Sequence, residues 1–309
     1  MDLNPFRLCS GIKVLGYFMI LIVLAIVALS YDAVVVLTWA PHLRDGGFTS
    51  FLSFIIIITF HILLVMLMWS YIKVVSQDPG CVPENWKLVS EQNIEEGNSV
   101  ALSDYASIQP PTPTLSTDEI ERRQSQSKGY CSKCQKGKPP RCHHCSVCQR
   151  CVLKMDHHCI WVVNCVGARN YKFFLLFVVY TFLTTTLDTV VLLPSFVKFF
   201  QQAKNHSLSP GNIAVIFLVF VLNLAFSLSL LCFVIMHASL LSSNTTSVEV
   251  YEKKKTVQWK YDLGLKRNFE QVFGANKALW FFPLFSTKDL ENIPALHGME
   301  FPTRSNAVE

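Results

Sequence analysis

Signals for N-myristoylation and for prenylation are missing from this sequence. Position 2 is aspartate, where N-myristoylation requires glycine, and the C-terminus carries no prenylation box. No small-residue cleavage signature follows the first long apolar run before Trp39, and that run is too long for the apolar part of a signal peptide. We therefore expect the run to be retained, and membrane attachment to depend on segments that cross the bilayer.

Charged residues are also scarce, at 16% of 309 residues, because long stretches of the chain are almost purely apolar. Four runs stand out, at residues 14–37, 51–72, 173–197 and 213–241. Each is long enough to cross a hydrocarbon core of about 30 Å, which needs roughly 20 helical residues. A buried helix of a soluble protein could explain one such run but not four. We therefore expect an all-α polytopic membrane protein with four transmembrane helices, two within residues 14–72 and two within residues 171–241.

The distribution of Lys and Arg predicts which side of the membrane each region faces. All but three of the 27 basic residues lie in the N-terminal segment 1–13, in the long loop between the second and third runs, or after the fourth run. The exceptions are Arg44, Lys198 and Lys204. Because basic residues mark the cytosolic side, we expect both termini and the long loop to be cytosolic. Membrane spans on both sides of the loop favour anionic lipid, and not nucleic acid, as its partner.

The long loop divides into two parts of very different composition. Residues 91–128 are rich in Ser, Glu, Gln and Pro without apolar periodicity, so we interpret residues 73–129 as a cytosolic linker that is partly disordered. Residues 131–165 contain eight cysteines and four histidines. A cytosolic segment keeps its thiols reduced, which excludes a disulfide framework and favours metal binding.

Two C-x-x-C pairs, Cys131/Cys134 and Cys145/Cys148, each suit one tetrahedral zinc ion. His144, Cys151, His158 and Cys165 supply further ligands. The segment has too few aliphatic residues to build an apolar core, so two zinc ions would supply most of its folding energy. Spacing alone leaves open which ligands share an ion and which cysteine stays unligated.

Several motifs resemble the DHHC palmitoyltransferase family, in particular its plant members. They are the run from Lys154 to Cys159, Asp78-Pro79-Gly80 after the second apolar run, Thr246-Ser247-Val248-Glu249 after the fourth, and Asn268 followed by Val272-Phe273-Gly274. The resemblance implies a cytosolic zinc-bound cysteine-rich domain of short β-hairpins and loops at residues 130–170, followed after the spans by a cytosolic C-terminal region at 242–309. It implies three Cys and one His on each zinc: Cys131, Cys134, His144 and Cys151 on one, Cys145, Cys148, His158 and Cys165 on the other.

The same resemblance leaves Cys142 and Cys159 unligated and implies that Cys159 is the nucleophile. A free thiol is weakly nucleophilic near neutral pH, so it needs a base, for which His157 is the candidate, with Asp156 orienting the imidazole. The expected reaction is transfer of a long-chain acyl group, such as palmitoyl, from acyl-CoA to Cys159 and then to cysteines of cytosolic-face substrate proteins. The family usually has Pro where this chain has Ile160 and Asn where it has Val163.

Further expectations concern substrate binding and location. Five side chains near the cysteine-rich segment are candidate contacts for CoA phosphates, namely Lys138, Arg141, His143, Arg169 and Lys172. The acyl chain would need an apolar cavity among the four helices, since each buried methylene is worth about 0.8 kcal/mol. Ser247 keeps a hydroxyl that can donate to Asp156. By resemblance we favour the Golgi or another endomembrane, although the plasma membrane also fits.

Two other protein classes compete with this interpretation. A membrane-anchored zinc module that only binds partners, such as a RING-like ubiquitin ligase, would explain the cysteines but not Asp156 and His157 beside an unligated Cys159. A transporter or channel should carry polar residues facing a pathway, and the four apolar runs mostly lack them.

Overall fold

Four long helices dominate the structure, which is a computed structural model describing residues 5–84, 86, 129–201, 210–252 and 259–304. The helices are α1 (Pro5–Tyr31), α2 (Gly47–Ser76), α5 (Tyr171–Gln201) and α6 (Pro210–Ser242). All four candidate spans are long and apolar enough to cross a membrane. This confirms the predicted fold class, an all-α integral membrane protein with four transmembrane helices. The linker at 91–128 and the segment around Lys204 lie outside the described residues.

The first span differs from a simple helix. After Tyr31 the chain continues as a π-helix, η1 (Asp32–Trp39), and a short 3₁₀ turn, η2 (Pro41–Arg44), before α2 begins. The hydroxyl of Thr38 donates to the carbonyl of Ala33 at 2.7 Å, five residues back, in keeping with the wider turn. The apolar pattern did not predict this change of helix type, because an α-helix and a π-helix that lie in a membrane are built from the same apolar residues.

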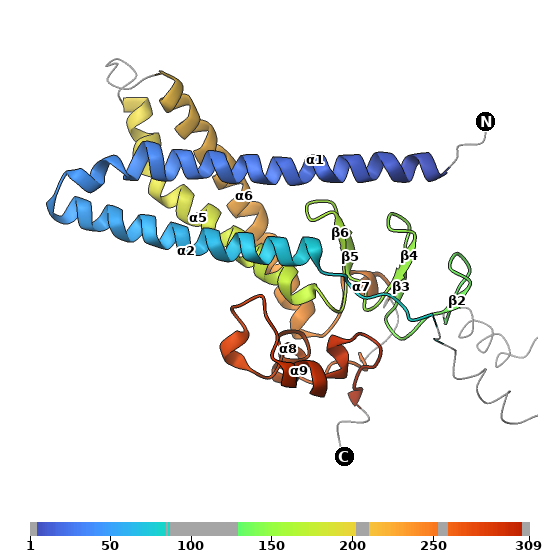
Figure 1. The fold of residues 1–309 in the computed structure, drawn as a ribbon. Helices are drawn as coiled ribbons and strands as arrows, with labels where there is room; N and C mark the ends of the chain where they lie inside the picture. Colours follow the sequence, from blue (N-terminus) through green and yellow to red (C-terminus); the bar gives the residue numbers. More distant parts are fainter. Residues whose placement is uncertain (1–4, 85, 87–128, 202–209, 253–258, 305–309) are drawn as a thin grey trace, which may run out of the picture.

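Three small β-hairpins form a domain at one end of the helical bundle (Figure 1). The antiparallel pairs are β1 (Tyr130–Cys131) with β2 (Lys136–Gly137), β3 (His143–Cys145) with β4 (Arg150–Val152), and β5 (His157–Cys159) with β6 (Asn164–Val166). We call residues 130–166 the hairpin domain. Its strands are only two or three residues long, which agrees with a domain held by side-chain clusters and not by an extended sheet.

The C-terminal region packs beneath the same end of the bundle (Figure 1). It contains α7 (Ser247–Glu252), α8 (Leu265–Phe273), η3 (Lys277–Leu279), α9 (Thr287–Asn292) and η4 (Pro294–Leu296). One buried core joins Tyr71 of α2, Cys159 of β5, Phe174 of α5, Leu241 of α6 and Val272 of α8. The hairpins, the helix ends and the C-terminal region therefore meet around Cys159.

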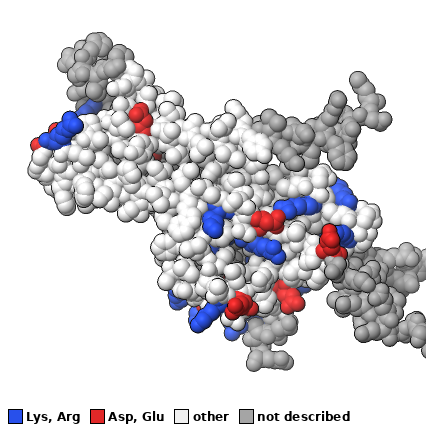
Figure 2. Space-filling model, in the orientation of Figure 1, with Lys and Arg blue, Asp and Glu red and all other residues white. Residues whose placement is uncertain are grey.

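Most of the charged side chains on the face drawn lie at one end of the molecule (Figure 2). On the face drawn in Figure 2, charged side chains gather over the hairpin domain and the C-terminal region, while the bundle is uncharged over most of its length. This is the distribution expected if the bundle faces lipid and the other end faces water.

Candidate metal centres and active site

The three hairpins repeat one design at intervals of fourteen residues. Cys131 pairs with Lys136 across the first hairpin, Cys145 with Arg150 across the second, and Cys159 with Asn164 across the third. The residue at the tight turn has a positive φ of 53° in each case, at Gln135, Gln149 and Val163. Cys131, Cys145 and Cys159 therefore occupy equivalent positions.

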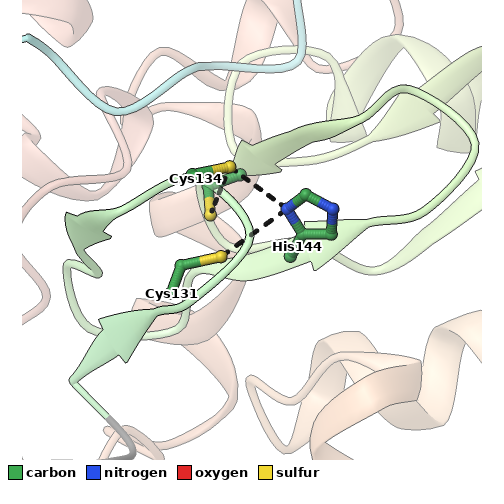
Figure 3. A group of neighbouring side chains, drawn as sticks. Cys131, Cys134 and His144 are labelled. Carbon is green, nitrogen blue, oxygen red and sulfur yellow. Dashed lines mark hydrogen bonds between the residues drawn. The ribbon is translucent and has the colours of Figure 1, made fainter.

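The first hairpin helps to form a cluster of four possible metal ligands, Cys131, Cys134, His144 and Cys151. Figure 3 shows the sulfurs of Cys131 and Cys134 directed toward Nδ1 of His144, at 3.6 and 3.2 Å. The sulfurs of Cys151 and Cys134 are 3.7 Å apart. Tetrahedral zinc with ordinary bond lengths separates its ligand atoms by about 3.6–3.8 Å, so this cluster fits zinc.

The second cluster consists of Cys145, Cys148, His158 and Cys165. Nδ1 of His158 lies 3.8 Å from the Cys145 sulfur, 3.4 Å from that of Cys148 and 3.5 Å from that of Cys165. These separations again match the edges of a zinc tetrahedron. The structure thus gathers the eight residues into the two sets that the resemblance implied. Each set takes its His and last Cys from the hairpin after its C-x-x-C pair, so two ions would tie the three hairpins together.

The third hairpin breaks the repeat at one position. Val162 stands where the first two hairpins have Cys134 and Cys148, the second cysteine of each C-x-x-C pair. Cys159 therefore has no partner thiol at this spacing and belongs to neither cluster. It is 8% exposed and lies in the core shared with α5 and α8.

Asp156 and His157 stand next to this thiol in the arrangement that acid–base chemistry requires. Oδ2 of Asp156 lies 2.7 Å from Nδ1 of His157, and His157 is also hydrogen-bonded to Cys159. Burial lowers the pKa of His157, but the hydrogen bonds with Asp156 and Cys159 outweigh it and raise the pKa to about 9. A thiol beside an imidazole that a carboxylate orients is the arrangement of an activated nucleophile.

The carboxylate of Asp156 is held on its other side by α7. The backbone N–H of Ser247 donates to Oδ1 at 2.9 Å, and its hydroxyl donates to Oδ2 at 3.0 Å. Burial raises the pKa of Asp156, but the hydrogen bonds with His157 and Ser247 outweigh it and hold the pKa below its usual range. The hydrogen bond expected from the Ser247 hydroxyl is therefore present, with a backbone N–H that the sequence did not indicate.

A second histidine lies behind the first and was missed from sequence. His237 of α6 is buried, its ring is 6.1 Å from that of His157, and its Nδ1 is 3.1 Å from the hydroxyl of Tyr171. The rings of Phe174 and Phe233 pack against the imidazole of His237, with ring centroids 5.3 and 4.6 Å from its own. Its place in an apolar run was the available signal, since ionisable groups within spans are uncommon.

The five basic side chains expected near CoA fall into two groups. Lys138 and His143 are half-buried and Arg169 is exposed. Arg141, in contrast, is buried in a two-pronged ion pair with Glu249, with N···O distances of 2.6 and 2.8 Å. Lys172 is also buried, and its ammonium donates to the carbonyls of Phe273 and Leu284. Arg141 and Lys172 are therefore engaged inside the fold and are not placed to meet a CoA phosphate, contrary to the prediction.

Comparison with known proteins agrees with this geometry. The DHHC palmitoyltransferase family profile matches residues 124–254. "Probable protein S-acyltransferase 12" of Arabidopsis thaliana is 59% identical over 98% of this chain and 99% of its own length. The chain belongs to the DHHC palmitoyltransferase family. "Probable protein S-acyltransferase 14" of the same plant is 49% identical over 97% of this chain, and palmitoyltransferase ZDHHC20 of Bos taurus is 33% identical over 96% of this chain and 79% of its own.

Two residues of this DHHC protein, Ile160 and Val163, differ from those usual in the family, and the structure shows where each one lies. Val163 takes a left-handed conformation, which asparagine adopts readily and which is strained for a β-branched residue. Its methyl groups press against Gly16 of α1, where an added Cβ would overlap them. Ile160 is exposed at the turn after Cys159. Neither residue belongs to a metal cluster.

Proposed function

We propose that this DHHC protein is a protein S-acyltransferase that moves a long-chain acyl group from acyl-CoA to Cys159 and then to cysteines of substrate proteins. The observation that supports it most is a thiol outside both metal clusters that shares a hydrogen bond with His157, which Asp156 and α7 hold in place. A RING-like ligase has no use for this arrangement, and neither the family match nor the relatives favour that alternative.

The proposed reaction consists of two thioester exchanges. The Cys159 thiolate attacks the acyl carbonyl of acyl-CoA, the new C–S bond forms, and the C–S bond to CoA breaks with the proton of His157 going to the CoA thiolate. The thiol of the substrate protein then gives its proton to His157 and attacks the acyl group on Cys159. Bonds of one kind form and break, so one site serves both steps.

The zinc ions would have a structural role. Each proposed set supplies four ligands, which leaves no open position for a substrate. The ion of the second set would fix the hairpin that carries Cys159, because its ligands His158 and Cys165 lie opposite each other on the two strands of that hairpin. In this proposal the metal contributes folding energy to the hairpin domain and takes no part in proton or acyl transfer.

An acyl-labelling experiment combined with a zinc count tests the assignment. Incubation with an alkyne-tagged palmitoyl-CoA should label the wild type through a hydroxylamine-labile bond, and Cys159→Ser should abolish that label while two zinc ions per chain remain. Cys148→Ser is the matched control and should lose zinc. If Cys159→Ser takes up as much label as the wild type, or if it loses zinc, Cys159 is not the free nucleophile.

The proposed contacts for the CoA phosphates are Lys138, His143 and Arg169, because Arg141 and Lys172 are paired inside the fold. Replacing Lys138 and Arg169 by alanine should raise the KM for palmitoyl-CoA with little change in kcat, because the phosphates carry no charge change in the reaction. Lys266→Ala, an exposed position on α8, is the control. An unchanged KM in the double variant would refute these contacts.

We propose further that both termini and the hairpin domain face the cytosol, in the Golgi or another endomembrane. The basic residues of the hairpin domain and the C-terminal region support this orientation. A glycosylation sequon engineered into the linker at 91–128 should then remain unglycosylated. A glycan there would show that the linker faces the opposite side and would contradict the proposed topology.

A further inference from the structure

Residues 280–285, between η3 and α9, form an apolar segment that we call the aromatic loop. Its sequence is Trp-Phe-Phe-Pro-Leu-Phe. Three of its side chains lie largely outside the protein core, with Phe281 69% exposed, Phe282 42% and Leu284 39%. Contiguous exposed apolar side chains usually mark a surface that something else covers.

The aromatic loop lies beside two spans, well away from their ends. The hydroxyl of Tyr180 on α5 donates to the carbonyl of Phe281 at 2.7 Å. Tyr180 follows the first residue of α5 by nine positions, or about 14 Å along the helix axis. On α2, the ring of Trp69 is 6.3 Å from that of Phe282, seven residues or about 10 Å before the helix ends. Both spans place the loop at a similar depth.

Several of the loop's polar backbone groups have partners within the protein, as a lipid environment requires. The N–H of Phe282 donates to the carbonyl of Leu279, and that of Leu284 donates to the carbonyl of Phe282. The ammonium of Lys172 reaches the carbonyl of Leu284 and lies 4.5 Å from the ring of Phe285. Pro283 has no N–H to satisfy. An irregular segment in water would not need partners of this kind from within a span.

We propose that the aromatic loop inserts into the lipid leaflet on the side of the hairpin domain, where lipid acyl chains and headgroups cover Phe281, Phe282 and Leu284. Lys172 and Tyr180 are the residues that hold it there. The loop touches α2 through Trp69 and α5 through Tyr180, and both helices expose apolar side chains, so lipid that covers the spans would also reach the loop. This role also explains why Lys172 is buried.

Insertion would fix the depth of the active site. The loop follows α8, and Val272 of α8 shares a buried core with Cys159. The C-terminal region is thereby anchored to the bilayer at a point other than the spans, and it carries this constraint to the hairpin that holds the nucleophile. The inference rests on the positions of the spans and does not depend on acyl transfer.

Photo-crosslinking in lipid nanodiscs tests the proposal. The full chain would carry p-benzoylphenylalanine in place of Phe281, a substitution that keeps the aromatic ring. After irradiation, mass spectrometry of the labelled peptide should find phospholipid adducts at a yield similar to that of the same label at Val65, which is 62% exposed on α2. The aqueous control carries the label at Glu300, which is exposed and precedes Phe301, the residue whose ring packs on Arg141. Its adduct yield should be at least tenfold lower.

Two further results would decide against the proposal. A label at Phe281 that yields no lipid adduct while Val65 does would show that the loop is not in the leaflet, and a crosslink to a second copy of the chain would identify a protein interface in its place. Tyr180→Phe, which removes one anchor but keeps the ring, should reduce the lipid adduct at Phe281 at least twofold without reducing the zinc content. An unchanged adduct would remove Tyr180 from the anchor.

Discussion

The ion pair between Arg141 and Glu249 should be among the most costly interactions to break in this protein. Arg141 Nε and one terminal nitrogen contact both carboxylate oxygens of Glu249, and the side chains are only 1% and 4% exposed. The guanidinium also donates to the side chain and carbonyl of Asn244 and lies 4.8 Å from the ring of Tyr261 and 4.9 Å from that of Phe301. This cluster joins the hairpin domain, the start of α7 and the C-terminal region.

Glu249→Gln keeps the size of the side chain but leaves a buried positive charge without its partner. Breaking a buried pair in this way costs about 3–5 kcal/mol, because the remaining charge has already lost its hydration. Replacing both partners by apolar residues is often close to neutral. We therefore expect Glu249→Gln to lower the free energy of unfolding of the hairpin domain by about 3–5 kcal/mol, and Arg141→Met with Glu249→Leu to recover most of it.

Urea titrations followed by tryptophan fluorescence measure this effect in detergent, with zinc held constant. Acyl-enzyme formation should fall in the same single variant, because Glu249 lies in α7 with Ser247, which holds Asp156. Glu291→Gln, at an exposed position on α9, is the matched control. A loss below about 1 kcal/mol in Glu249→Gln, or a double variant less stable than the single one, would refute the reasoning.

Three other predictions follow from buried groups. Burial lowers the pKa of Lys154 to about 7, so the unfolded state binds more protons between pH 7 and about 10 and stability rises with pH there; Lys154→Met should show a smaller rise in urea titrations at pH 7 and 9. Gly16→Ala should overlap Val163 and lower the thermal midpoint through a loss of about 1–3 kcal/mol, which Val163→Ala in the same chain should restore. His237→Ala should slow acyl-enzyme labelling by roughly 10²-fold by loosening His157, while His237→Phe, which keeps a ring there, should retain most of the rate.

The membrane spans could be predicted because their signal is local. A helix in lipid needs about 20 apolar residues in a row, and composition alone reveals them. The ligand sets were different, since spacing left open which cysteines share an ion and only the family resemblance separated them. The fourteen-residue repeat would have reduced this ambiguity, because it aligns Cys159 with Cys131 and Cys145 and shows valine where each of them has a second cysteine.

The two wrong expectations share a physical cause. Arg141 and Lys172 are basic residues close to the nucleophile in sequence, which made them reasonable phosphate contacts. Their partners, Glu249 and the carbonyl of Leu284, lie about a hundred residues further along the chain. A buried cation needs such partners, and neither pattern nor composition shows which distant groups will meet it. Lys138, His143 and Arg169, with more exposed side chains, remain consistent with the original expectation.

The repeat also suggests why the proposed nucleophile sits on a hairpin of metal-binding type. In the second hairpin Cys145 has Cys148 as its neighbour, whereas in the third the same position beside Cys159 is Val162, so the strand geometry is retained and the second thiolate is absent. His158 and Cys165 lie on opposite strands of the third hairpin and belong to the second cluster. Zinc bound there would hold both strands without binding the sulfur of Cys159. Thiol chemistry requires a positioned base within hydrogen-bond reach. A hairpin fixed from both strands supplies that reach, because His157 precedes a ligand directly and cannot move independently of it.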